Sequence, residues 1–93
     1  MRHVLYFTAD WCNPCKKVRP IVEEINKDSI TKFLFIDIDT ELSLAQDYEV
    51  RSIPTFILLE DGKEIKRVSG AQTQEQLMGL INHEQNTKND IQS

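Results

Sequence analysis

The chain has few of the features that mark fibrous, low-complexity or membrane proteins. Its 93 residues include three glycines, three prolines, two cysteines and one tryptophan. No apolar run approaches the roughly 20 residues that a membrane helix needs. Basic residues are also scarce, with 11 against 15 acidic ones, so the net charge is −4 and nucleic acid is not an expected partner. A chain of this length and composition is typical of one globular domain with a modest core.

The amino-terminal segment and the two cysteines indicate the compartment. The apolar stretch at 4–7 is too short for a signal peptide and no small-residue cleavage site follows it, so we expect a cytoplasmic protein. Cys12 and Cys15 are three positions apart, and a disulfide across so small a loop adds little stability. In a reducing compartment such a pair is typical of redox catalysis or metal binding. Zinc needs four ligands, and the only histidines, His3 and His83, lie near the termini, so no metal site is predicted.

Hydrophobic periodicity predicts seven elements in the order β-α-β-α-β-β-α. Strands are expected at residues 4–7, 33–38, 55–60 and 63–68. A first helix should begin near Pro14 and end at 26–29, a short one should span 42–48 with Thr40 as its cap, and a last one should follow the capping box at 73–76. The helix between the first two strands predicts that they are parallel, and Asp61-Gly62 predicts a hairpin between the last two.

This order predicts an α/β fold built on a four-stranded mixed sheet with helices on both faces. The first helix is expected on one face and the two later helices on the other. Both faces of the strand at 33–38 are largely apolar, which indicates a covered sheet. We expect the domain to span residues 1–85 and a polar carboxyl-terminal tail to occupy 86–93.

The cysteine pair falls where the first strand gives way to the first helix. Cys12 is expected at or just before the helix start, where free N–H groups and the helix dipole stabilise a thiolate. Because a thiolate is the nucleophile of disulfide exchange, Cys12 is predicted to attack and Cys15 to resolve the mixed disulfide. Pro14 stiffens the turn between them, and Trp11 offers an apolar surface beside it.

Two motifs resemble those of the thioredoxin family. The run Trp11-Cys12-Asn13-Pro14-Cys15-Lys16 resembles the family's W-C-G-P-C-K, with Asn13 in place of glycine, and Ile53-Pro54-Thr55 resembles its I-P-T. The resemblance covers about residues 4–85. It implies a thioredoxin-like fold in which the proline of the second motif is cis and faces the cysteines, and in which the Ile53 backbone pairs with an extended substrate. The implied substrate-binding residues are Trp11, Asn13, Pro14, Ile53 and Pro54.

The resemblance implies a thiol–disulfide oxidoreductase that reduces protein disulfides and holds no cofactor. Its own disulfide would be reduced by NADPH through a thioredoxin reductase, or by glutathione if the chain acts like a glutaredoxin. The protein is expected to be a monomer with no membrane partner, and compact phage-encoded members of the family suggest ribonucleotide reductase as one recipient of its electrons. The alternative function is a binding module on the same scaffold that works without redox chemistry.

The chain departs from the family pattern at two points that affect the chemistry. Thioredoxins usually carry an additional strand and helix before the cysteine motif, and we expect both to be absent here. The family's buried aspartate falls on Tyr6, and the lysine that accompanies it falls on Phe35. Because that aspartate assists proton transfer at the inner cysteine in the family, we expect Asp10, Asp37 or a water molecule to substitute for it.

Overall fold

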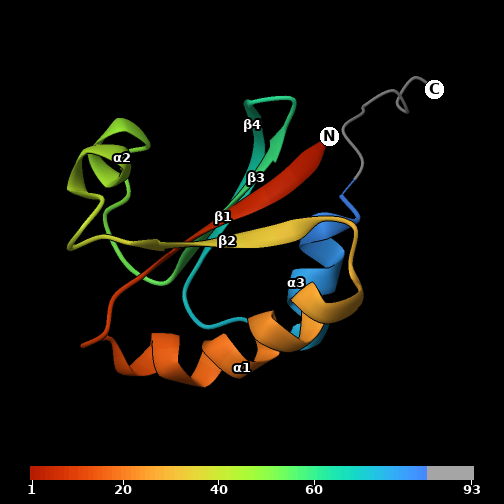
Figure 1. Ribbon diagram of the computed structural model, residues 1–93, viewed down its shortest axis with the longest axis horizontal. Coiled ribbons are helices and arrows are strands. Elements are labelled where there is room, and N and C mark those ends of the chain that lie inside the picture. The colour runs from red at the N-terminus through yellow and green to blue at the C-terminus, as the bar shows by residue number, and fades with distance from the viewer. Residues whose placement is uncertain (84–93) are drawn as a thin grey trace.

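The computed structural model describes residues 1–83 and has the seven elements in the predicted order (Figure 1). The expected tail at 86–93 lies outside the described residues. The elements are β1 (Arg2–Thr8), α1 (Asn13–Asp28), β2 (Lys32–Asp37), α2 (Leu42–Asp47), β3 (Thr55–Glu60), β4 (Lys63–Ser69) and α3 (Gln74–Ile81). The capping box before α3 is present, with Thr73 and Gln76 bonded to each other's backbone N–H.

The four strands form one mixed sheet in the order β2-β1-β3-β4. β1 runs parallel to β2 and antiparallel to β3, as predicted from the connections. β1 lies between two other strands, and helices cover both faces of the sheet. Because both of its faces are covered, the middle of β1, residues 4–7, is a continuous apolar run. Asp61 and Gly62 join β3 to β4 with φ angles of 53° and 85°, the two positive values that a type I′ turn requires.

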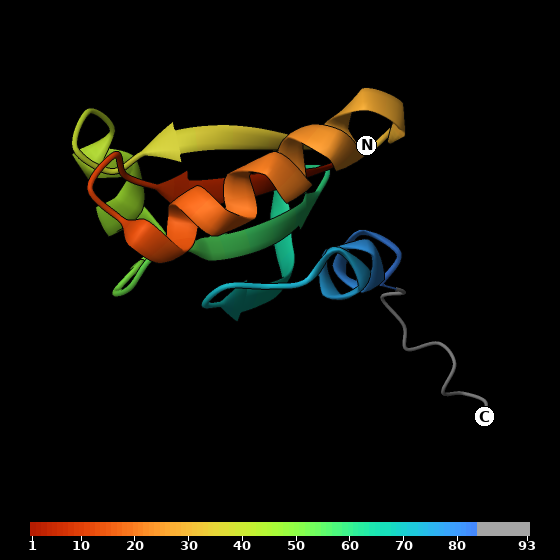
Figure 2. The same ribbon diagram turned by 90° about the horizontal axis from the view of Figure 1, so that it is seen from below.

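The prediction of which helices share a face was wrong. α1 and α3 pack together on one side of the sheet, and α2 lies alone on the other (Figures 1 and 2). Val18 and Val22 of α1 join Leu77 and Leu80 of α3 in one apolar cluster, whereas Ala45 of α2 belongs to a second. One helix is too narrow to cover four twisted strands. α3 therefore completes the cover over the face that α1 begins to bury.

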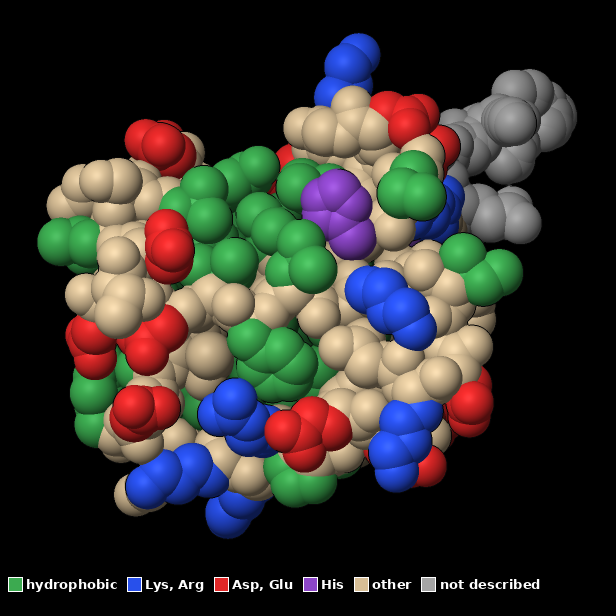
Figure 3. Space-filling view, in the orientation of Figure 1, with side chains coloured by type: hydrophobic (Ala, Val, Ile, Leu, Met, Phe, Trp, Pro, Cys, Tyr) green, Lys and Arg blue, Asp and Glu red, His purple; other side chains and the backbone are tan. Residues whose placement is uncertain are grey.

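The second helix differs from its prediction in both its cap and its cover. α2 begins after Glu41 and has no side-chain cap, whereas the Thr40 hydroxyl instead donates to the Asp37 carbonyl at 3.3 Å. The tight turn after β2 explains this, since the same carbonyl accepts the Thr40 and Glu41 N–H groups. A helix of six residues also leaves Leu34 of β2 44 % exposed. Figure 3 shows apolar side chains gathered on this α2 side of the sheet.

The outer edge of β2 is partly occupied by the side chain of Asn26, near the end of α1. Its amide donates to the Phe33 carbonyl at 3.0 Å and accepts the Phe33 N–H at 2.8 Å. Since these two backbone groups bond to Asn26, they face away from β1, on the side where a further strand would pair. Turn contacts to the Asp37 carbonyl close the other end of the strand. Shortening of a free edge in this way opposes pairing with other chains.

We expect Asn26→Ala to lower the free energy of unfolding by roughly 1–3 kcal/mol, because two part-buried backbone groups of Phe33 lose their partner. The opened edge should also cause self-association as concentration rises. Urea denaturation and light scattering after size-exclusion chromatography measure the two effects. Lys27→Ala is the matched control, since Lys27 neighbours Asn26 and makes only an exposed ion pair with Glu24. A variant with the stability and mass of this control would contradict the role of Asn26.

Candidate active site

Cys12 and Cys15 are joined by a disulfide at the start of α1. Cys12 is the residue that caps the helix; its backbone is extended and its sulfur accepts the Cys15 N–H at 3.2 Å. Pro14 stands in the first turn, where its missing N–H leaves no bond unmade. The sequence prediction of a sulfur at a helix start is therefore confirmed, and a Cys12 thiolate at this position has a backbone donor and the positive end of the helix dipole beside it.

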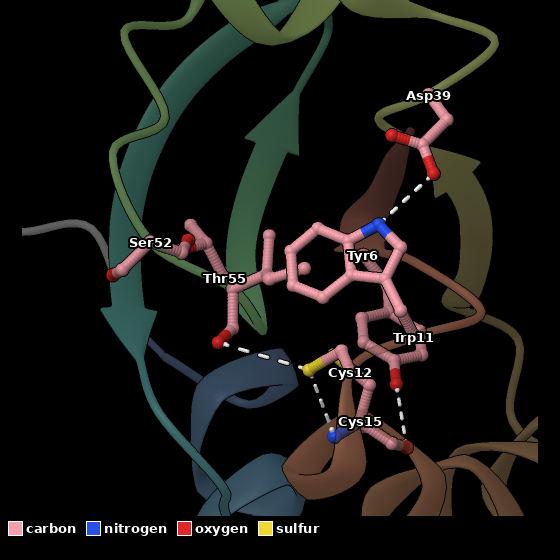
Figure 4. Close-up of a disulfide and its surroundings, with 8 residues drawn as sticks. Tyr6, Trp11, Cys12, Cys15, Asp39, Ser52 and Thr55 are labelled. Carbon is pink, nitrogen blue, oxygen red and sulfur yellow. Dashed lines mark hydrogen bonds between the residues drawn. A yellow bond between two sulfur atoms is a disulfide. The ribbon is translucent and has the colours of Figure 1, made fainter.

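The second motif lies against the first, as the resemblance implied. The Ile53–Pro54 peptide is cis, and the Ile53 carbonyl is 4.0 Å from the Cys12 sulfur. Pro54 is fully buried, and the Thr55 hydroxyl donates to the Ser52 carbonyl at 2.6 Å, which closes the turn (Figure 4). Two segments that are about forty residues apart thus meet at one sulfur.

An apolar groove opens beside the cysteines. Trp11 is 62 % exposed, and its indole N–H donates to the Asp39 carboxylate at 3.0 Å, which holds the ring in place (Figure 4). The groove has a volume of about 360 Å³, and its apolar lining consists of Trp11, Ile38, Leu42, Ala45, Val50 and Ile53. Asn13 and Pro14 are exposed on the surface that carries the cysteines. The arrangement leaves an open surface on which another chain can lie.

Several residues of this surface were missed at the level of sequence. Asp39 follows β2 and was not linked to Trp11, Leu42 was assigned only to a short helix, and Val50 was given no role. The sequence contained only a weak signal that these residues would lie near Trp11. Parallel pairing of the first two strands places the end of β2 beside the end of β1, so residues after both strands can meet. The orientation of α2 over that end has no signature in the sequence.

The position that suits a buried acid is occupied by an aromatic cluster. Tyr6 is fully buried; its ring stacks on Phe56 at 4.8 Å and meets the edge of Phe35 at 5.2 Å. Its hydroxyl donates to the Cys15 carbonyl at 3.1 Å. Burial raises the pKa of Tyr6, so the phenol keeps its proton at neutral pH. Tyr6 and Phe35 are neighbours across β1 and β2, so an aromatic pair occupies the two positions that the resemblance matches to an aspartate and a lysine.

The two acidic residues singled out for proton transfer lie in different surroundings. Asp10 is exposed and lines a cavity of about 80 Å³, to which Cys15 also contributes. Asp37 is half-buried, and its carboxylate accepts the Asp39 N–H at 2.8 Å. Thr8 lies between them, since it lines the same cavity as Asp10 and pairs with Asp37 across the sheet.

A protein-family model for thioredoxin matches residues 1–83. The chain belongs to the thioredoxin family. Thioredoxin H-type 1 of Nicotiana tabacum is 37 % identical over 81 residues, which cover 86 % of this chain and 64 % of that protein. A thioredoxin of Mycobacterium tuberculosis is 45 % identical over 67 residues, which cover 70 % of this chain and 58 % of that protein. The chain thus spans less than two thirds of the length of these two relatives.

Solved thioredoxin structures share the fold. A mutant thioredoxin from Halobacterium salinarum superposes with a TM-score of 0.83 at 36 % identity, covering 87 % of this chain and 72 % of that one. The thioredoxin of Fasciola hepatica gives 0.81 at 36 % identity, with 87 % and 78 % covered. The thioredoxin-like fold with a four-stranded mixed sheet is therefore confirmed, and it carries a Cys-x-x-Cys disulfide. Within the described residues, no helix is long and apolar enough to cross a membrane.

Proposed function

We propose that this protein reduces disulfide bonds in other proteins, with Cys12 as the attacking thiol and Cys15 as the resolving thiol. The observation that carries the proposal is the position of Cys12, whose sulfur accepts a backbone N–H at the first turn of α1. Donors at a helix start stabilise the thiolate over the thiol, and the thiolate is the form that attacks a disulfide. The exposed groove beside Trp11 gives the substrate a surface to bind.

The reaction proceeds through two exchanges. The Cys12 thiolate attacks one sulfur of the substrate disulfide, so that a Cys12–substrate bond forms and the other substrate sulfur leaves as a thiolate. Cys15 then loses its proton and attacks the Cys12 sulfur, which forms the Cys12–Cys15 disulfide and releases the second substrate sulfur. The two substrate thiolates take up two protons. The protein dithiol is oxidised by two electrons and the substrate disulfide is reduced by two.

Substrate contact is assigned to five residues around the sulfur. The Ile53 carbonyl, 4.0 Å from the Cys12 sulfur, is placed to accept a backbone N–H of an extended substrate segment. Pro54 holds that segment of the chain, and Trp11, Asn13 and Pro14 form the surface on the other side. An apolar side chain of the substrate would fill the groove, because burial of apolar surface is the main source of affinity there.

The remaining parts of the proposal concern the partners. We propose that the oxidised protein is reduced by NADPH through a thioredoxin reductase, without a bound cofactor, and that glutathione is the alternative donor. The protein is proposed to act as a cytoplasmic monomer on disulfide-containing proteins, with ribonucleotide reductase as one candidate. The family supports protein disulfides and a reductase as the general partners.

Reduction of insulin disulfides, followed by turbidity, tests both the activity and the donor. We expect the protein to accelerate the reaction when it is supplied with dithiothreitol, or with NADPH and thioredoxin reductase. Acceleration with glutathione and glutathione reductase alone would assign the second donor. Protein with both cysteines alkylated is the control. Rates equal to this control with all three donors would contradict the proposal and favour the redox-independent binding module, which the replacement of a buried acid by Tyr6 keeps as the second candidate.

A further inference from the structure

The resolving thiol has to lose a proton inside the protein. Cys15 is 2 % exposed, and its attack on the Cys12 sulfur requires the thiolate. The side chain packed closest to this turn of the helix, Tyr6, donates its proton to the Cys15 carbonyl, and its pKa is raised by burial. Tyr6 is thus a protonated hydrogen-bond donor to the backbone at neutral pH, and a protonated phenol does not act as the base.

A small cavity connects Cys15 with the surface near the end of β1. Its volume is about 80 Å³, and it is lined by Thr8, Ala9, Asp10, Cys15, Lys16 and Arg19. A cavity needs only about 10–15 Å³ of space to hold a water molecule, provided that polar groups are present to bind it. The Thr8 hydroxyl is buried, whereas Asp10 is exposed at the outer side. One cavity is therefore lined both by the buried Cys15 and by an acidic residue in contact with solvent, Asp10.

We propose that the proton of Cys15 leaves through this cavity to Asp10 by way of a water molecule that the Thr8 hydroxyl holds in place. The inference rests on the proposed function, because it concerns the second exchange of that reaction. In this step the Cys15 S–H bond breaks, the water passes a proton to the Asp10 carboxylate, and the new sulfur–sulfur bond displaces the substrate thiolate. Asp10 returns the proton to bulk solvent, or to the departing thiolate, and is ionised again.

The charged residues near the cavity distinguish Asp10 from Asp37 as the proton acceptor. Lys16 and Arg19 of α1 supply two cations to its lining. Asp37 of β2 is the other acidic residue considered for proton transfer, and it lies opposite Thr8 in the strand pairing. Asp37 does not line the cavity, and its carboxylate already accepts the Asp39 N–H. Asp37 is therefore the matched control for Asp10.

A reaction with an aromatic disulfide reagent separates the two exchanges in one stopped-flow trace. Attack by Cys12 releases the first equivalent of chromophore, and attack by Cys15 on the mixed disulfide releases the second. For Asp10→Asn we expect a first phase within about twofold of wild type and a second phase at least about tenfold slower at neutral pH, since a positioned base contributes roughly 10²–10⁴-fold. The deficit should shrink as pH rises, because hydroxide then removes the proton. Thr8→Val should slow only the second phase, and Asp37→Asn neither phase.

The second phase in Asp10→Asn is the decisive measurement. A second phase in Asp10→Asn equal to that of wild type would overturn the proposal. Equal slowing of both phases would do the same, since it would indicate a disturbed helix start. A slower second phase in Asp37→Asn with a normal one in Asp10→Asn would place the acceptor on β2 and also overturn it. Absence of the first phase in wild-type protein would instead refute the proposed function, so the two failures are distinguishable.

Discussion

Cys12→Ser should reduce the rate of insulin reduction to that of the uncatalysed reaction, a loss of at least about a hundredfold, because a serine hydroxyl stays protonated and is a poor nucleophile at neutral pH. Cys12 is the only one of the two cysteines whose sulfur caps α1 and lies 4.0 Å from the Ile53 carbonyl. Turbidity with dithiothreitol as donor measures the effect.

Cys15→Ser should have a different result, because it removes the second exchange and leaves the first. The variant should accumulate mixed disulfides through Cys12, visible by mass spectrometry and on non-reducing gels, while turnover falls to the background rate. The double variant Cys12→Ser with Cys15→Ser is the control and should trap nothing. Accumulation of mixed disulfides by Cys12→Ser, and none by Cys15→Ser, would show that the two roles are reversed.

Tyr6→Asp should destabilise the protein by at least about 3 kcal/mol at neutral pH, because the change removes a large buried ring and introduces a carboxyl group into an aromatic cluster. The tyrosine ring packs between Phe35 and Phe56, and its hydroxyl donates to the Cys15 carbonyl and interacts with the Thr8 side chain. The substitution places an acid at the position that the resemblance matches to the family's buried aspartate.

The pH dependence of this variant follows from the same burial. An apolar site raises the pKa of the new aspartate in the folded state above its unfolded value of about 3.9. The folded state then binds more protons than the unfolded state between those two pKa values, so stability falls as pH rises through that window. Urea denaturation at pH 4 and pH 7 should show a smaller loss, relative to wild type, at the lower pH.

Tyr6→Phe is the matched control for Tyr6→Asp. Tyr6→Phe keeps the ring and removes only the hydroxyl, which donates to the Cys15 carbonyl. We therefore expect the free energy of unfolding to fall by about 1 kcal/mol, equally at pH 4 and pH 7. A Tyr6→Asp protein as stable as Tyr6→Phe at both pH values would contradict the picture of a closed aromatic cluster. It would indicate that the site can admit water or a counter-charge.

The motifs and most element boundaries could be predicted from the sequence because they depend on neighbouring residues. The strand Thr55–Glu60 follows from a continuous apolar run, the Asp61-Gly62 turn from positive φ, and the capping box at Thr73 and Gln76 from side-chain reach within a few residues. The helix start at Cys12 is of the same kind, since a proline two positions later marks the first turn.

Contacts between distant segments could not be predicted in this way. The Trp11–Asp39 hydrogen bond depends on how two strand ends face each other in three dimensions. The bonds from Asn26 to Phe33 depend on which edge of the sheet is free, and the cap predicted at Thr40 failed because a turn at Asp37 had already used its hydroxyl. In each case a polar group had several partners within reach, and packing selected among them.

The sequence by itself determined the order of elements and the position of Cys12 at a helix start, because both depend on neighbouring residues, and two motifs carried the resemblance to the family to which the chain belongs. Only the tertiary structure decided that α1 and α3 share one face and that Tyr6 bonds to the Cys15 carbonyl. It alone also shows that Asp10, but not Asp37, shares a cavity with Cys15. The physical reason is that burial and proton access depend on which surfaces meet, and residue spacing does not specify that meeting.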